Sequence, residues 1–139
     1  MFAMRYVCEE DRAFWFALDR QLSANEFMHK CRDKRGYIIS DDGKPIGLMR
    51  YNLMWDIVPF LTLIHIDESC QRRGFGQQAM AHWENEMREL KHTMLMTSTQ
   101  VNEEAQHFYR KLGYIEKGGI FLDHTPFAQP QEMFLVKVL

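Results

Sequence analysis

The sequence predicts an α+β domain built on one mixed β-sheet, and two observations support this. Short apolar segments separated by turn residues occupy positions 37–66, which is typical of antiparallel strands. A strand at 60–66 then leads through a glycine-containing loop and a long amphipathic segment to another strand at 93–99. A helical crossover makes those two strands parallel, so the sheet contains both kinds of strand pair.

The first third of the chain is predicted to supply one strand and two helices. The strand spans residues 4–8, and a helix with one apolar face follows it. Ser23 and Glu26 have the spacing of a capping box, so a second helix begins there. We expect that helix to end at Gly36, because glycine is the usual residue after a helix C-terminus.

The next two strands, at 37–40 and 46–51, form a predicted hairpin. The Asp42-Gly43 pair between them favours a tight turn. Residues 52–59 are expected to be a connection that leads to the strand at 60–66.

The second half of the chain is predicted to contain two helices and three strands. The first helix carries one apolar stripe at helical spacing, made of Ala79, Met80, Trp83, Met87 and Leu90. After the strand at 93–99, Asn102 is placed to cap the second helix, which Gly113 ends. Two final strands follow at 114–122 and 133–139.

Composition limits the classes of function. With 139 residues, 46% of them hydrophobic, the chain has the size of one domain, taken as residues 1–139. A net charge of −2 without a basic stripe argues against nucleic acid as a partner. The three cysteines lack metal-binding or redox spacing, which favours reduced thiols, a cytoplasmic location and no metal. No signal peptide and no bilayer-spanning apolar run is apparent, so no membrane partner is expected.

The loop at 71–76 is the strongest local signal in the chain. Gly74 and Gly76 allow close approach of a ligand to the backbone, and the N–H groups at the start of the following helix favour an anion. Arg72 and Arg73 add positive charge, so the loop is predicted to bind a diphosphate.

Three other interpretations of the glycines in this loop exist: a P-loop, a dinucleotide-binding fingerprint and an ordinary helix start. A P-loop requires Gly-Lys-Ser/Thr, which is absent. The pattern Gly74-x-Gly76-x-x-Ala79 fits a dinucleotide fingerprint, but the next strand has no acidic residue for the ribose. Taken alone, the loop is also compatible with an ordinary helix start whose glycines allow close packing.

A second motif extends the argument. The loop reads Gln71-Arg72-Arg73-Gly74-Phe75-Gly76, and about 30 residues later the chain reads Asn102-x-x-Ala105-x-x-Phe108-Tyr109-x-x-x-Gly113-Tyr114. Together they strongly resemble the GCN5-related N-acetyltransferase (GNAT) superfamily, which has Gln/Arg-x-x-Gly-x-Gly/Ala after its fourth strand and the second pattern after its fifth. The resemblance covers roughly residues 58–121.

The resemblance implies a fold and a cosubstrate. The fold is a GNAT-type mixed sheet of about seven strands flanked by about four helices, with central parallel strands that splay apart and hold acetyl-CoA. The pyrophosphate would lie on the loop amides, the backbone near Ile66 would pair with the pantetheine arm, and Asn102 would contact that arm from the other strand. The implied cofactor-binding residues are Ile66, Gln71, Arg72, Arg73, Gly74, Phe75, Gly76, Gln77 and Asn102.

Tyr109 is the residue that the resemblance places in catalysis. A phenol near the sulfur can protonate the departing thiolate as a general acid. The competing interpretation is that Phe108 and Tyr109 are simply an aromatic core pair.

The sequence does not identify the general base of the reaction. Related proteins often carry Glu or His at positions that here hold Phe60 and Thr62. The remaining candidates are His65, Asp67, Glu68, Asp56 or a water chain. For the acceptor we expect Trp55 and Asp56, by cation–π contact and charge, and His65.

The leading hypothesis is therefore an N-acetyltransferase that moves acetyl from acetyl-CoA to a primary amine by direct attack. Its partner would be a small-molecule amine or a peptide N-terminus, with a homodimer left open. The alternative is an acyl-CoA-binding regulatory module without turnover. A nucleotide-dependent oxidoreductase is a third, weaker idea.

Overall fold

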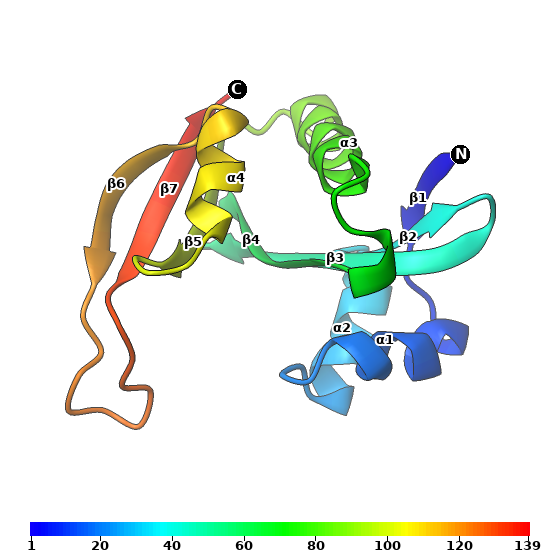
Figure 1. Ribbon diagram of the computed structural model, residues 1–139, viewed down its shortest axis with the longest axis horizontal. Helices are drawn as coiled ribbons and strands as arrows, with labels where there is room; N and C mark the ends of the chain where they lie inside the picture. Colours follow the sequence, from blue (N-terminus) through cyan, green and yellow to red (C-terminus); the bar gives the residue numbers. More distant parts are fainter. The chain divides into compact units, whose positions relative to one another are not determined.

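The computed structural model describes residues 1–139 and contains seven strands and four α-helices, with two short 3-10 helices (Figure 1). The elements in chain order are β1 (Phe2–Tyr6), η1 (Glu9–Asp11), α1 (Arg12–Leu18), α2 (Ala24–Asp33), β2 (Gly36–Asp41), β3 (Lys44–Met54), β4 (Val58–Ile66), η2 (Glu68–Cys70), α3 (Phe75–Glu89), β5 (Met94–Gln100), α4 (Ala105–Lys111), β6 (Ile115–Ile120) and β7 (Glu132–Val138).

The strands form one mixed sheet with the order β1-β2-β3-β4-β5-β7-β6. The β4–β5 pair is parallel, whereas β1–β2, β2–β3, β5–β7 and β6–β7 are antiparallel. The predicted fold class, a mixed sheet of seven strands with four helices, is confirmed.

The chain divides into two compact units. The first consists of Met1–Asn52 with Thr62–Glu86, and the second of Leu53–Leu61 with Met87–Leu139. The division passes through β4 between Leu61 and Thr62. Each unit is described in turn.

In the first unit, helices cover both faces of the strands. α1 and α2 lie on one side of β2 and β3, and α3 lies on the other (Figure 1). The core under α1 and α2 consists of Val7, Trp15, Phe27, Ile38 and Leu48. The rings of Trp15 and Phe27 meet edge to face with centroids 5.6 Å apart, and neither side chain is exposed. These two aromatics are therefore core residues.

The local signals of the first unit have mixed outcomes. The hydroxyl of Ser23 accepts a hydrogen bond from the Glu26 N–H at 3.1 Å, which confirms the predicted start of α2. The prediction that Gly36 ends this helix is wrong: Lys34 is the C-cap, in the left-handed region at φ 57°. Gly36 instead begins β2, where an added Cβ would lie 2.8 Å from Val7 Cγ1. The glycine serves close packing rather than helix termination.

In the second unit, β5 pairs with β7 along its whole length, and β6 forms the edge. The parallel β4–β5 ladder joins Phe60 to Met96 and Leu61 to Thr97. Thr97 reinforces this ladder, because its hydroxyl donates to the Leu61 carbonyl at 3.0 Å. The expectation that the strands splay apart after Leu61 stays a prediction.

The start of α4 differs from the prediction. Asn102 is not its cap, because the helix begins at Ala105 with Glu104 as the N-cap residue. Two hydrogen bonds hold the preceding residues in a separate turn: the Glu103 N–H donates to the Gln100 carbonyl, and the Glu103 carboxylate accepts from the Gln100 N–H. An acidic side chain that bonds backward thus delays the helix, and it leaves Asn102 exposed in the turn.

The connection expected at 52–59 is also shorter in the structure. β3 extends to Met54 and β4 begins at Val58, so a tight turn joins them. Its tip residues Trp55 and Asp56 both have positive φ, 54° and 66°. A turn with two such residues matches the twist of a hairpin, and Asn or Gly would adopt it with less strain than Trp does.

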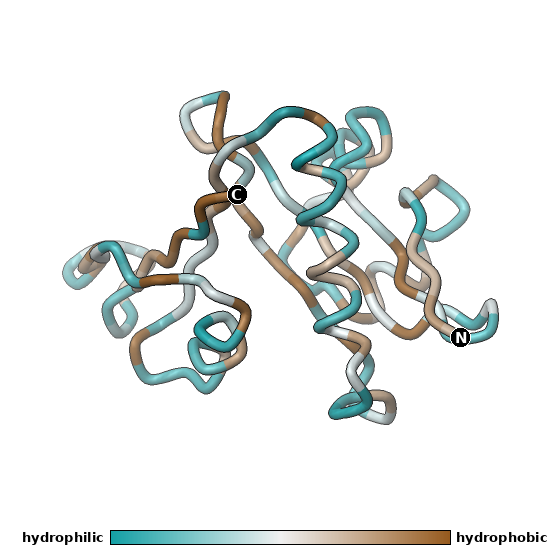
Figure 2. The backbone as a smooth tube through the Cα atoms, turned by 90° about the horizontal axis from the view of Figure 1, so that it is seen from above, coloured by the Kyte–Doolittle hydropathy of each residue, from teal (hydrophilic) through white to brown (hydrophobic).

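Hydropathy along the backbone follows the elements. In Figure 2 hydrophobic stretches, in brown, alternate with hydrophilic turns, in teal, and no helix is brown throughout. None of the helices combines the length and the apolar character that crossing a bilayer requires.

Candidate functional site

The loop before α3 has an unusual backbone. Arg72 and Gly74 both lie in the left-handed region, with φ of 63° and 85°, and α3 starts at the next residue, Phe75. A Cβ added to Gly74 would meet no atom within 4 Å. The backbone at this glycine is therefore open to a ligand.

The amide hydrogens of this loop are free. From Arg72 through Gln77, no backbone N–H donates to a carbonyl of the protein, and the next one, at Gln78, donates to Gly74 O at 3.1 Å. The first N–H groups of any helix lack intrahelical partners, and the left-handed residues extend this set into the loop. Six consecutive free donors at the positive end of a 15-residue helix favour an anion.

The side chains of the loop fall into two groups. Gln71 ties the loop to β4, because its amide donates to the Ile66 carbonyl at 2.8 Å. Arg73 lies 3.4 Å from the Asp41 carboxylate and stacks over the Phe75 ring at 5.1 Å. Arg72 is exposed and has no such partner. The loop thus keeps at least one uncommitted positive charge beside its free amides.

Tyr109 occupies a buried position in the second unit. Its side chain is 6% exposed, and its ring packs against Phe108 and Tyr114 at centroid distances of 5.3 and 5.9 Å. Burial raises the pKa of the phenol above its usual value, and a hydrogen bond with Thr97 offsets only part of that rise. At neutral pH the group is therefore protonated and able to donate.

Thr97 is a site residue that the sequence argument missed. The residue is 1% exposed, and its hydroxyl donates to Leu61 O and is hydrogen-bonded to the Tyr109 phenol. The chain of hydrogen bonds runs from α4 through β5 to β4 within the second unit. The only sequence signal is a threonine after three apolar residues in a strand, which would not have singled it out.

The other predicted residues lie apart from these two regions. Trp55, 70% exposed, and Asp56 form the turn before β4, whereas the glycine loop comes after β4. His65 is half-buried and makes no hydrogen bond. Asp67 and Glu68, two candidates for the general base, belong to the turn at η2, with Asp67 as its N-cap.

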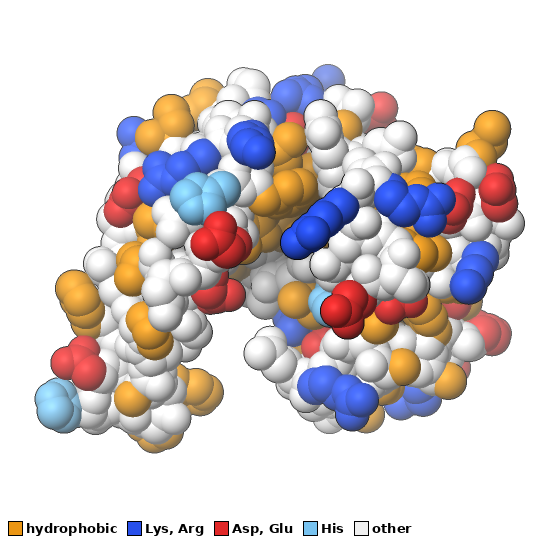
Figure 3. All heavy atoms as spheres, in the orientation of Figure 1, with side chains coloured by type: hydrophobic (Ala, Val, Ile, Leu, Met, Phe, Trp, Pro, Cys, Tyr) orange, Lys and Arg blue, Asp and Glu red, His pale blue; other side chains and the backbone are white.

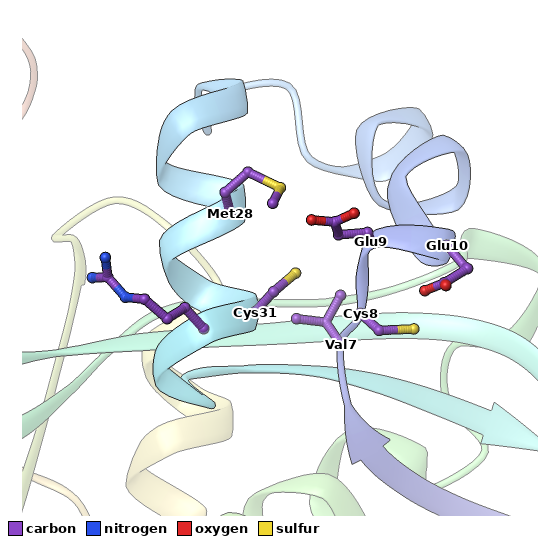
Figure 4. A pocket seen from close by; sticks show the side chains of 7 residues that line it. Val7, Cys8, Glu9, Glu10, Met28 and Cys31 are labelled. Atoms are coloured by element: carbon purple, nitrogen blue, oxygen red, sulfur yellow. The ribbon is translucent and has the colours of Figure 1, made fainter.

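A hollow of about 370 Å³ lies elsewhere in the first unit, between the end of β1 and α2. Figure 4 shows Cys8 and Val7 on one side and Met28 and Cys31 from α2 on the other. The pKa of the Cys8 thiol is raised, first by its hydrogen bond with Glu10, and burial raises that of Cys31. Neither thiol is activated as a nucleophile.

Two further features concern the surface charges and the groupings of His, Cys, Asp and Glu side chains. Figure 3 shows acidic and basic side chains interspersed on the face in view, without a basic stripe. No cluster of three or more His, Cys, Asp or Glu side chains is arranged to hold a metal ion.

Comparisons with known proteins agree with this geometry. A sequence model described as the acetyltransferase (GNAT) family matches residues 4–114. No curated protein sequence matches the chain.

Solved structures match over nearly the whole chain. Ard1 from Thermoplasma volcanium has a TM-score of 0.85 at 14% identity, covering 99% of this chain and 97% of its own. The ribosomal-protein-S18-alanine N-acetyltransferase from Escherichia coli has 0.81 at 16%, covering 99% and 94%. The spermidine/spermine N-acetyltransferase SpeG from Vibrio cholerae has 0.77 at 16%, covering 99% and 92%. At such identities the likeness shows a shared fold.

Proposed function

Because this chain belongs to the acetyltransferase (GNAT) family, we propose that it transfers acetyl from acetyl-CoA to a primary amine. Residues 1–139 act together as one N-acetyltransferase domain in this proposal. The observation that carries it is the run of six free backbone N–H groups from Arg72 to Gln77 at the start of α3.

The loop has the donors that a pyrophosphate needs. A diphosphate presents several oxygens to backbone amides, and the helix dipole favours its charge. Gly74 leaves room for it, Arg72 adds an uncommitted charge, and Gln71 holds the loop against β4. The backbone at Ile66 and the exposed Asn102 are the residues that we propose for the pantetheine arm.

Acetyl-CoA supplies the thioester, whose C–S bond breaks as the amine nitrogen bonds to the acetyl carbon. Tyr109 donates its phenolic proton to the thiolate that departs, as a general acid. Its raised pKa keeps that proton in place at neutral pH. Thr97 holds the phenol oxygen in place by the hydrogen bond between them.

The acceptor amine must lose a proton before or as it attacks. Phe60 packs against Phe134 with centroids 6.2 Å apart, so an apolar pair occupies one position where related proteins often carry a base. We assign this step to a water chain or to His65, whose side chain makes no hydrogen bond that would compete. Trp55 and Asp56 remain acceptor candidates, since Trp55 is exposed in the turn before β4.

The acceptor class is a small-molecule amine or a peptide N-terminus. The Escherichia coli neighbour is named for a ribosomal-protein alanine and the Vibrio cholerae neighbour for polyamines, so the fold is used with both.

The test is release of free coenzyme A thiol from acetyl-CoA with a panel of amines, with product mass as the second readout. The panel includes alanine-initiated peptides, spermidine and single amino acids. We expect a mass increase of one acetyl group on at least one acceptor. Tight acetyl-CoA binding without turnover of any amine would instead establish the acyl-CoA-binding module, and an absence of binding would refute both.

A further inference from the structure

The first unit contains a second cationic centre, buried on the face opposite to α3. Arg50 lies on β3, two residues beyond Leu48, so both side chains point to the face that α1 and α2 cover. Its side chain is 7% exposed. An arginine this deep in a fold requires partners for its charge and its donors.

One partner is the carboxylate of Asp19, which follows α1. Arg50 Nε donates to Asp19 Oδ2 at 2.9 Å, and the Trp15 indole donates to the same oxygen at 3.0 Å. The other oxygen accepts from the backbone N–H groups of Gln21 and Leu22. Burial acts to raise the Asp19 pKa, but these bonds outweigh it and the pKa is lowered, so the carboxylate is charged. All four of its hydrogen bonds are already in place.

The outer end of the Arg50 guanidinium is not used. Nη1 and Nη2 donate to no group of the protein. The only side-chain nitrogen or oxygen that is fully enclosed without a partner is Trp83 Nε1, so the two Nη atoms keep some contact with solvent. The guanidinium is thus anchored through Nε, and its two Nη atoms are unpaired but not fully enclosed.

A second positive charge lies close to this fork. Lys30 of α2 donates to the Tyr51 carbonyl at 2.7 Å. Because Tyr51 follows Arg50 in β3, this hydrogen bond holds the Lys30 ammonium next to the backbone of Arg50. Burial lowers the Lys30 pKa, and the charge of Arg50 is the next cause. Arg35 acts in the same direction, and Glu26 and Asp33 oppose it. Asp19 forms an ion pair with Arg50, whereas Lys30 bonds to a backbone carbonyl and forms no ion pair with a carboxylate.

We propose that Arg50 and Lys30 form a carboxylate-binding site in the first unit. Two parallel N–H groups of a guanidinium match the two oxygens of a carboxylate, and the ammonium of Lys30 adds charge without a directional requirement. The same charges disfavour a polycation such as spermidine. The carboxylate comes either from the acceptor itself, in which case this inference rests on the proposed function, or from a separate small ligand.

The first experiment measures binding and needs no turnover. Propionate is titrated into ¹⁵N-labelled protein while the arginine side-chain resonances are followed, with propionamide and sodium chloride at equal ionic strength as controls. We expect the Arg50 resonance, identified by its loss in Arg50→Lys, to shift saturably with propionate alone. A wild-type protein whose Arg50 signal responds no differently to propionate than to chloride overturns the site.

The variants separate the fork from the charge. Arg50→Lys keeps a cation beside Asp19 but removes the fork, so we expect affinity for propionate to fall about tenfold. Lys30→Met keeps the aliphatic stem and is expected to weaken binding about threefold, and it stands in should Arg50→Lys fail to fold. Arg32→Lys on the exposed side of α2 is the matched control and is expected to bind as wild type. Wild-type affinity in both Arg50→Lys and Lys30→Met would refute the assignment.

Kinetics with the pair alanine and alaninamide distinguish the two sources. If the acceptor supplies the carboxylate, Arg50→Lys raises KM for alanine but not for alaninamide, and propionate competes with the amine. If the ligand is separate, propionate binds without competing. Both results support the site, and only the first makes it part of acceptor recognition. If no amine is acetylated, the proposed function fails while the titration still decides this inference.

Discussion

The loop before α3 and the surroundings of Tyr109 prepare two parts of the proposed reaction in opposite ways. In the proposed reaction the loop binds its ligand through main-chain N–H groups. These groups are free because the backbone of Arg72 and Gly74 is in the left-handed conformation and α3 begins at the next residue. The Tyr109 region contributes one side-chain oxygen. Its residue is buried, and the oxygen is hydrogen-bonded to Thr97.

This difference has a consequence for mutation. A main-chain site tolerates changes of side chain and is sensitive to changes of backbone, whereas a single catalytic atom is lost with one substitution. The loop should therefore respond gradually, through the affinity for acetyl-CoA. The Tyr109 region should respond sharply, through the rate.

The largest expected effect, and the most direct way to break the contrast, is Tyr109→Phe. It removes the proton donor but keeps the ring that packs against Phe108 and Tyr114. We expect kcat to fall about 100-fold with KM for acetyl-CoA unchanged, because the lost interaction acts in the transition state. Steady-state kinetics at saturating acceptor measure both parameters.

Tyr114→Phe is the matched control, since it removes another buried phenol from the same aromatic cluster. It is expected to keep kcat within about twofold. A Tyr109→Phe enzyme with the wild-type rate would show that the pair with Phe108 is only packing.

An alkaline pH should lower the free energy of unfolding through Tyr109 and two further buried tyrosines. Burial raises the pKa values of Tyr37, Tyr51 and Tyr109 above the value of about 10 that an unfolded chain has. Above pH 10 the unfolded chain binds fewer protons than the folded one, so the free energy of unfolding falls as pH rises. Each tyrosine contributes a slope of up to about 1.4 kcal/mol per pH unit, and the contribution is complete below pH 10.

Urea unfolding at pH 8, 10 and 11 measures this loss. Tyr109→Phe removes one of the three contributions and is expected to flatten the slope between pH 10 and 11. An equally steep slope in that variant would mean that Tyr109 titrates in the folded protein as it does in the unfolded chain.

The smallest expected effect concerns the loop, where Gly74→Ala should weaken the affinity for acetyl-CoA. Gly74→Ala places a methyl group in open space at φ 85°, where a ligand on the free amides would lie. We expect KM for acetyl-CoA to rise about tenfold with kcat little changed, since a Cβ in this conformation costs about 1 kcal/mol and blocks close approach. Isothermal titration with coenzyme A gives the affinity directly.

The chain offers a close control at Gly43, which has φ 81° and also no atom within 4 Å of an added Cβ. Gly43→Ala introduces the same backbone strain in the β2–β3 turn, so it should lower stability by a similar amount and leave coenzyme A affinity unchanged. Equal effects of both variants on affinity would argue that Gly74 matters only for folding.

Local signals predicted the elements well where neighbouring residues decide them. Ser23 and Glu26 marked the start of α2, and Asp42-Gly43 formed the expected hairpin turn with two positive φ values. Errors arose where a contact from elsewhere intervened. Gly36 packs against Val7, and Glu103 bonds back to Gln100, which moved a helix end and a helix start.

By itself the sequence determined the order of strands and helices, the family resemblance and the glycine loop, because turns, caps and helix starts depend on adjacent residues. Only the tertiary structure decided that Thr97 meets Leu61, 36 positions away, and that Arg50 meets Asp19, 31 positions away. Burial of a polar group and the partners left to it depend on which distant elements pack together. That packing supplies both the hydrogen bond between Thr97 and Tyr109 and the ion pair between Arg50 and Asp19.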